Sequence, residues 1–293
     1  FYLTQNDGTV VLARVAAANP VYSFASGPTN SMRGAAFLTG LKEAMVVDVG
    51  GTTSDIGCLV GGFPREANNV VEVGGVRTLF RMPDLLPMAL GGGTIIDLDK
   101  GTIGPRSVGY RITSEALVFG GSTLTTTDVA VAAGLVEIGD RDRVRHLDRG
   151  VVRDLLKRIE VMVEDNVDRM KTSAEGVRLI AVGGGSFLIP ERLKGASEVL
   201  RVEHAGVANA LGAAMAQVSG EVDQVFSGMG RDAALAEAVK IARERAMEAG
   251  ARPSSIVTLE AEDIPIAYLP GDARRVRVRV VGDISFSRTS KAA

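Results

Sequence analysis

Residues 45–57 read Met-Val-Val-Asp-Val-Gly-Gly-Thr-Thr-Ser-Asp-Ile-Gly, and this stretch decides how the rest of the chain is interpreted. The β-branched run around Asp48 predicts a strand, and apolar residues resume after Asp55, so the glycine pair between them predicts a tight turn. Glycine permits positive φ and brings no Cβ that would hold a ligand away from the backbone. Successive N–H groups in such a turn form a concavity that binds anions.

The side chains around this turn favour a metal-bound phosphate over a plain hairpin. Asp48 and Asp55 supply hard oxygen ligands of the kind that Mg²⁺ prefers, and hydroxyl groups follow the glycines. A hairpin needs neither the two carboxylates nor the run of hydroxyls. The sequence contains neither the lysine-bearing phosphate loop nor the dinucleotide fingerprint that otherwise hold phosphates. We therefore predict that the two aspartates bind Mg²⁺ or its waters. The residues predicted to bind phosphate are Gly50, Gly51, Thr52 and Thr53.

The stretch from Val46 to Gly57 resembles the phosphate signature of the actin, sugar-kinase and heat-shock chaperone superfamily of ATPases. More narrowly, the chain resembles the hydantoinase A/5-oxoprolinase family over roughly its first 190 residues. Further motifs match in the family's order: Phe24-Ala-Ser-Gly-Pro, Gly34-Ala35-Ala36, Gly91-Gly92-Gly93-Thr94, Gly101-Thr102-Ile103-Gly104-Pro105-Arg106-Ser107 and Thr127-Asp128.

The resemblance implies an α/β fold, a ribonuclease-H-like lobe of the actin-like ATPases with a mixed sheet flanked by helices. It implies ATP and Mg²⁺ as cofactors, and ATP-dependent hydrolysis of a cyclic amide such as hydantoin or 5-oxoproline. Phosphorylation of the amide oxygen would make this poor electrophile reactive. On the same resemblance, Asp128 is expected to act beside Asp48 and Asp55 as a catalytic residue. Residues 125–128 also suit the cap of a helix, and that alternative stays open.

A second glycine turn follows residues 177–182, where an apolar strand ends in Gly183, Gly184 and Gly185. This turn resembles the adenosine-contacting turn of the same superfamily, in which backbone without side chains lies flat against the base and ribose. Family members often have alanine in the middle of the turn and proline after it. Here the turn reads Gly-Gly-Gly-Ser, so the individual contacts stay open.

Periodicity and capping residues predict the remaining elements. Apolar residues at three- and four-residue spacing after Asp148 predict a long helix that ends at Met170. Further helices are predicted at residues 8–18, 205–219 and 231–249, and strands at 256–259, 264–269 and 275–281. A small-residue helix capped by Asn30 or Ser31 is predicted through Leu41, and its Gly34 is expected to approach the phosphate strand pair. Residues 91–94 are expected either to contact the nucleotide or substrate or to begin a surface hairpin that turns at Lys100-Gly101, and both alternatives stay open. We expect an ATPase lobe over residues 1–223 and a C-terminal α+β extension, a helix plus a β-hairpin, over residues 224–293.

The composition is that of an ordinary globular protein. Hydrophobic residues make up 46% and charged residues 23%, and the net charge of −2 gives no general attraction to nucleic acid or to an anionic membrane. No apolar run approaches the roughly 20 residues that cross a bilayer. The single cysteine, Cys58, excludes an internal disulfide and fits a cytoplasmic protein.

Arg275, Arg277 and Arg279 alternate with valines, so they lie on one face of a predicted strand. This face suits either RNA binding or a solvated or interdomain sheet surface, and we favour the sheet surface over RNA binding.

The superfamily has two phosphate turns, one in each lobe, and this sequence contains one good copy. We expect the other on a missing N-terminal lobe upstream of Phe1, and we therefore expect this chain to be inactive alone. The expected partners are a small cyclic amide, that lobe, and a partner subunit or a second copy, with no nucleic acid and no membrane. Two alternatives stay open, a non-enzymatic ATP-binding or assembly subunit and a small-molecule kinase, because phosphate signatures do not identify the substrate.

Overall fold

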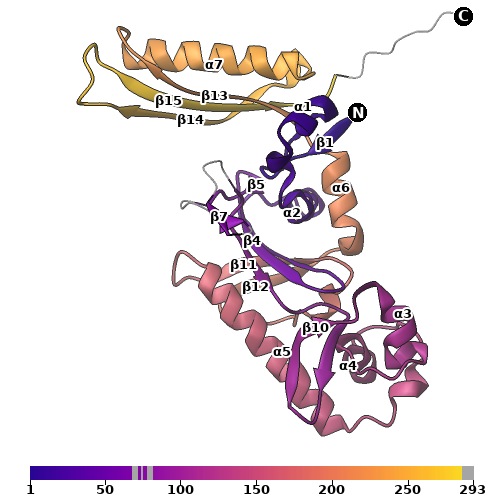
Figure 1. Ribbon diagram of the computed structural model, residues 1–293. Coiled ribbons are helices and arrows are strands. Elements are labelled where there is room, and N and C mark those ends of the chain that lie inside the picture. The colour runs from indigo at the N-terminus through magenta and orange to yellow at the C-terminus, as the bar shows by residue number, and fades with distance from the viewer. Residues whose placement is uncertain (68–71, 74, 78–81, 286–293) are drawn as a thin grey trace, which may run out of the picture. The chain divides into compact units, whose positions relative to one another are not determined.

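The computed structural model describes residues 1–67, 72–73, 75–77 and 82–285 (Figure 1). The chain forms two compact units, one of residues 27–214 and one that joins residues 1–26 to residues 215–293. Each unit has its own sheet and its own hydrophobic core. None of the helices in these described ranges is long and apolar enough to cross a membrane.

The sheet of the 27–214 unit has the strand order β12-β11-β3-β4-β5, and β8 also pairs with β4. Strand β11 runs parallel to β3 and β12, whereas β4 is antiparallel to β3, β5 and β8. The strands are β3 (Ala44–Val49), β4 (Ser54–Val60), β5 (Phe63–Pro64), β8 (Leu85–Met88), β11 (Val177–Val182) and β12 (Ala196–Arg201). This mixed sheet with flanking helices is the ribonuclease-H-like lobe expected from the sequence.

Helices pack on both faces of this sheet. Because side chains alternate along a strand, Val47 and Val49 of β3 pack with the buried stripe of α5 (Arg149–Met170), while Val46 packs with α2 (Ser26–Thr39). Helix α5 begins after Asp148, whose carboxylate accepts hydrogen bonds from the N–H groups of Gly150 and Val151. The predicted long helix is thus confirmed at both ends.

Helix α2 begins at Ser26, earlier than its expected start at Asn30 or Ser31. We expected Gly34 to approach the phosphate strand pair, but it lies against the backbone of Ala208 in α6 (Ala208–Ala214). A Cβ on Gly34 would overlap the Ala208 carbonyl, so the glycine is what allows the two helices to approach. Contact with the strands comes instead from Met32 and Ala35.

The rest of the 27–214 unit consists of short elements around the sheet. The predicted hairpin after residue 93 is present as the antiparallel pair β9 and β10. These elements are β6 (Glu72–Val73), β7 (Val76–Arg77), β9 (Thr94–Asp97), β10 (Thr102–Ser107), α3 (Ile112–Glu115), α4 (Thr126–Ala133), and the 3₁₀ turns Gly109–Arg111, Leu117–Phe119, Arg141–Val144, Ser186–Leu188 and Ala205–Val207.

The other unit is a sheet of order β1-β2-β13-β15-β14 covered on one face by α7. Alanines of α7 pack on valines of the strands, and Gly220 lets the helix approach, since a Cβ there would overlap the Ala242 carbonyl. The elements are β1 (Tyr2–Thr4), β2 (Val10–Leu12), α1 (Ala13–Ala18), β13 (Val218–Phe226), α7 (Arg231–Glu248), β14 (Val257–Pro265), β15 (Arg274–Gly282), and the 3₁₀ turns Pro20–Ser23 and Pro253–Ser255.

The division between the units differs from the boundary expected at residue 223, which falls inside β13. Strand β2 pairs in parallel with β13 through Val10 and Val218, so the first residues of the chain join its last ones. The single helix expected over residues 8–18 is a short strand followed by α1 for the same reason. Residues so far apart in sequence leave no local signal of their pairing.

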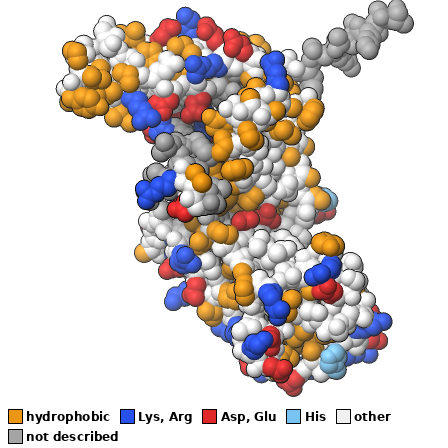
Figure 2. Space-filling view, viewed as in Figure 1, with side chains coloured by type: hydrophobic (Ala, Val, Ile, Leu, Met, Phe, Trp, Pro, Cys, Tyr) orange, Lys and Arg blue, Asp and Glu red, His pale blue; other side chains and the backbone are white. Residues whose placement is uncertain are grey.

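The arginines of β15 face acidic side chains from neighbouring strands. Arg275 forms two hydrogen bonds of 2.7 Å with Asp223, and Arg279 lies 3.6 Å from Asp7 and 3.8 Å from Glu260. On the surface seen in Figure 2, Lys and Arg side chains are likewise interspersed with Asp and Glu. Pairing of this kind neutralises the positive strand face, so the structure favours the solvated sheet face over RNA binding.

Candidate functional site

The stretch from which the sequence was interpreted forms the predicted strand, turn and strand. Pairing of β3 with β4 places Asp48 directly opposite Asp55 and Val49 opposite Ser54. The turn closes with a hydrogen bond of 2.9 Å from the Gly50 N–H to the Thr53 carbonyl. The two carboxylates therefore stand side by side at the base of an exposed glycine-threonine turn.

The turn accepts hydrogen bonds from the rest of the chain through its glycine carbonyl groups, while three of its N–H groups form none with the described residues. The carbonyl oxygens of Gly50 and Gly51 accept hydrogen bonds from the N–H groups of Gly92 (3.0 Å) and Gly93 (2.7 Å). The N–H groups at positions 51–53 and the two threonine hydroxyls form no hydrogen bond with any described residue. Donors without partners among the described residues form a concavity of the kind that binds anions, and the binding itself stays a prediction.

A second glycine segment, residues 91–93, supports the turn from behind. A Cβ on Gly91 would lie 2.7 Å from the backbone N and C of Thr52, and one on Gly93 would lie 2.9 Å from the Gly51 carbonyl. Ser54 adds a 2.5 Å hydrogen bond to the Leu90 carbonyl. For this segment the sequence left ligand contact and a surface hairpin equally open. The structure shows a third role, as the layer on which the phosphate turn rests.

Helix α4 holds this supporting segment through side chains that the sequence suggested only as caps. The hydroxyl of Thr126 donates to the Gly91 carbonyl, and that of Thr127 donates to the Gly92 carbonyl at 2.7 Å. Both threonines are buried. No local signal marks this function in the sequence, because each hydroxyl and its acceptor are 35 residues apart in the chain.

Asp128, expected from the sequence to be catalytic or to cap a helix, forms the cap. Its side chain is 0% exposed, and its carboxylate accepts hydrogen bonds from the N–H of Val118 (2.8 Å) and from the N–H and hydroxyl of Thr125 (2.7 Å each). Thr125 in turn accepts from the Asp128 N–H, which completes a capping box. The carboxylate is therefore bonded to its own chain rather than directed at a ligand.

Both carboxylates at the turn are easier to protonate than an ordinary aspartate. Burial raises the pKa of Asp48 above its ordinary value, partly offset by a hydrogen bond from Ser31 of α2. Burial, followed by the charge of Asp48, raises the pKa of Asp55. No ion pair with a described residue neutralises either group. Like charges at adjoining, partly buried positions form a site that a cation would stabilise.

The donor set suits Mg²⁺ held together with a phosphate. Within the described ranges, no group of three or more His, Cys, Asp or Glu side chains could hold a metal, so a closed protein-only metal site is absent there. Mg²⁺ is commonly bound by one or two carboxylates, with phosphate oxygens and waters completing its shell. Asp48 and Asp55 beside free N–H donors fit that arrangement.

Replacement of Asp55 by Asn is expected to stabilise the protein at pH 7 by about 0.2–1 kcal/mol, the size of a like-charge pair directly across two strands. Because the pKa of Asp55 is raised in the folded state, proton binding at Asp55 stabilises the folded wild-type protein, fully at a pH below the unfolded pKa. That stabilisation is lost as the pH rises through the folded pKa of Asp55. The gain from the substitution should therefore vanish at a pH below the unfolded pKa of about 3.9. Urea unfolding at both pH values measures it, and an equal gain at both would contradict the cause.

The glycine turn after β11 lies against the phosphate turn. Gly183 has a φ of +88°, and a Cβ there would overlap the Asp48 carboxylate and the Val49 carbonyl. The Gly185 N–H donates to the Val49 carbonyl at 2.8 Å, whereas a Cβ on Gly184 would meet nothing within 4 Å. Parallel pairing of β11 with β3 brings these turns together. The middle glycine faces open space, as a turn that lies flat against a ligand requires.

Comparisons with known proteins give a matching family and similar folds. Residues 1–140 match the family described as Hydantoinase/oxoprolinase, whereas no curated protein matches the chain. The nucleotide-free structure of an acetone carboxylase, which carries out ATP-dependent acetone carboxylation, superposes with a TM-score of 0.67 at 16% identity over 97% of this chain. The ATP-dependent caprolactamase from Pseudomonas jessenii does so with a TM-score of 0.66 at 17% identity over 96%. Both likenesses show a shared fold, and this chain spans about half, 53%, of each of those chains.

Proposed function

Because residues 1–140 match the model of the hydantoinase/oxoprolinase family, we propose that this chain is the nucleotide-holding lobe of an ATP-dependent enzyme that opens cyclic amides. The observation that carries the proposal is the exposed turn with free N–H groups directly beside two carboxylates. The caprolactamase that shares this fold is itself ATP-dependent, which supports the proposal. The proposed substrate is a hydantoin- or 5-oxoproline-like cyclic amide.

We assign the N–H groups of Gly51, Thr52 and Thr53, with the two hydroxyls, to phosphate oxygens. Gly50 sets the turn through its bond to Thr53, and Asp48 and Asp55 hold Mg²⁺ or its waters. When bound, ATP supplies the phosphoryl group that activates the amide oxygen, and Mg²⁺ neutralises its charge. Catalysis of phosphoryl transfer comes mostly from positioning the phosphate and neutralising its charge, and these are the two roles assigned to the residues of this chain.

The turn of Gly183, Gly184 and Gly185 is assigned to the adenosine, since its middle residue is open and its flanking residues are fixed to β3. Asp128 is assigned a positioning role. Its buried cap orients α4, whose Thr126 and Thr127 hold the segment behind the phosphate turn.

The single cysteine, Cys58, is a free thiol, and a free thiol supports a location in the reducing cytoplasm.

Binding of Mg-ATP tests the lobe itself. At about 100 times its Kd, the ligand should stabilise the protein by roughly 2.7 kcal/mol, and calorimetry should give one site. Asp48→Ala should remove that binding, because one of the two carboxylates at the turn is lost. Asp99→Ala, at an exposed carboxylate in the β9–β10 connection, is the matched control and should bind normally. Equal binding by both variants would overturn the assignment.

Turnover tests the reaction. We propose that the chain has little activity by itself, because the described residues contain one phosphate turn and the similar structures are about twice as long. A longer protein that includes this chain should hydrolyse ATP in step with opening of 5-oxoproline, hydantoin or caprolactam. Acetone with bicarbonate is the comparison substrate, because the acetone carboxylase shares the fold equally well. If acetone with bicarbonate stimulates ATP hydrolysis and none of the cyclic amides does, the proposal that the substrate is a cyclic amide is wrong.

A further inference from the structure

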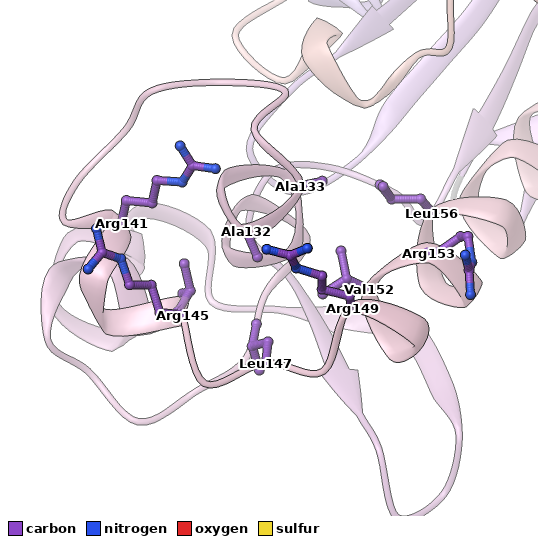
Figure 3. A pocket seen from close by; sticks show the side chains of 10 residues that line it. Ala132, Ala133, Arg141, Arg145, Leu147, Arg149, Val152, Arg153 and Leu156 are labelled. Atoms are coloured by element: carbon purple, nitrogen blue, oxygen red, sulfur yellow. The ribbon is translucent and has the colours of Figure 1, made fainter.

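A pocket of about 710 Å³ lies in the 27–214 unit, away from the phosphate turn in sequence and built by other residues. Its walls come from the end of α4, the turn at residues 141–147 and the first two turns of α5 (Figure 3). The volume lies within the range of roughly 300–1,000 Å³ that small-molecule sites occupy. The proposed function uses none of these residues.

Arginines without partners surround this pocket. Arg141 and Arg149 extend into view from opposite sides, and Arg153 follows one helical turn after Arg149 (Figure 3). None of the three forms a hydrogen bond or ion pair with a described residue. Asp140 and Asp142, on either side of Arg141, are paired with Arg143 and Arg145 instead, and Asp148, next to Arg149, caps α5. The positive charge of the pocket is therefore not neutralised from within.

The helix that supplies two of these arginines already has an acidic cap. Asp148 accepts hydrogen bonds from the N–H groups of Gly150 and Val151, and the first turn of α5 contains Arg149 but no acidic residue. The N-terminus of a helix carries partial positive charge, which the Asp148 carboxylate offsets. The arginine side chains, rather than the helix terminus, therefore supply the charge that an anion would meet in the pocket.

The floor of the pocket is apolar. Val152 and Leu156 from α5 and Ala132 from the end of α4 line it between the arginines. Residue 133 is also an alanine, so the wall on that side is formed by small side chains. A ligand that satisfies both the floor and the rim has a compact apolar body and an anionic group.

We propose that this pocket binds a small organic phosphate, with the phosphate held between Arg141 and Arg149 and the apolar part of the ligand on Val152 and Leu156. A guanidinium group donates two parallel hydrogen bonds to two oxygens of one phosphate. A phosphate has enough oxygens and charge for more than one arginine, so several arginines favour it over a singly charged group. The site is separate from the phosphate turn and does not depend on the function proposed for that turn.

Phenyl phosphate is the probe, because it joins a dianion to a compact apolar ring. Calorimetry should show saturable binding at one site, at least about tenfold tighter than inorganic phosphate and than phenol measured in the same way. Saturation of equal strength with inorganic phosphate would overturn the apolar half of the proposal. No saturation with phenyl phosphate would overturn the whole of it.

Variants locate the binding. Arg149→Gln and Arg141→Gln should each weaken phenyl phosphate by about tenfold or more, the loss of one charge-assisted pair. Arg143→Gln is the matched control, since Arg143 lies in the same turn but is paired with Asp140 and does not line the pocket. Ala133→Trp should also weaken binding by filling the space with every arginine kept. Equal affinity of Arg149→Gln and Arg143→Gln would place the probe elsewhere and overturn the assignment.

Discussion

Replacement of Asp128 by alanine is expected to lower the free energy of unfolding by roughly 2–6 kcal/mol, because each orphaned buried donor costs about 1–3 kcal/mol. Two buried backbone N–H groups, those of Val118 and Thr125, would lose their acceptor. The side chain is 0% exposed, so water does not replace the lost carboxylate without a rearrangement. Urea unfolding of the wild-type chain and the variant measures the difference.

Asp148→Ala provides the control for this change. Asp148 also caps a helix and also accepts two backbone N–H bonds, but its site is exposed, so water replaces the lost acceptor. The cost at an exposed cap is about 0.5–2 kcal/mol. A loss at Asp128 no greater than that at Asp148 would mean that burial of the Asp128 cap contributes nothing, and its positioning role would fall.

Gly183→Ala should damage both stability and nucleotide binding. The backbone at this residue has a φ of +88°, which costs an L-amino acid about 1–3 kcal/mol. The new Cβ would also overlap the Asp48 carboxylate and the Val49 carbonyl, so the carboxylate must move. We expect unfolding to become easier by at least that amount and the calorimetric Mg-ATP signal to fall in the protein that remains folded.

Gly184→Ala separates that effect from a general intolerance of the turn. A Cβ on Gly184 meets nothing within 4 Å, and its φ lies outside the left-handed range. Stability should stay within about 0.5 kcal/mol of the wild-type value, as at surface positions. If Gly184→Ala destabilises as much as Gly183→Ala, the close approach to Asp48 is not the cause. Weaker Mg-ATP binding by a stable Gly184→Ala would support the adenosine assignment.

The candidate site shows where local inference stops. The strand-turn-strand around Gly50 follows from β-branched residues, a glycine pair and hydroxyls that are neighbours in sequence. The same reasoning found Gly183 to Gly185, because a strand that ends in glycines is a local pattern. It did not show that Gly91 lies under Thr52 or that Thr126 holds it, since those contacts join segments tens of residues apart.

The sequence by itself determined the strand-turn-strand around Gly50, the long helix from its Asp148 cap to Met170, and the mixed α/β class, because each depends on neighbouring residues or on a family pattern. Only the tertiary structure decided that Asp128 is a buried cap, that residues 1–26 join the C-terminal unit through β13, and that the arginines of β15 are paired. Burial and charge pairing depend on residues that are distant in the chain. Periodicity and capping signals extend over a few turns of helix or one strand, so they carry no information on such partners.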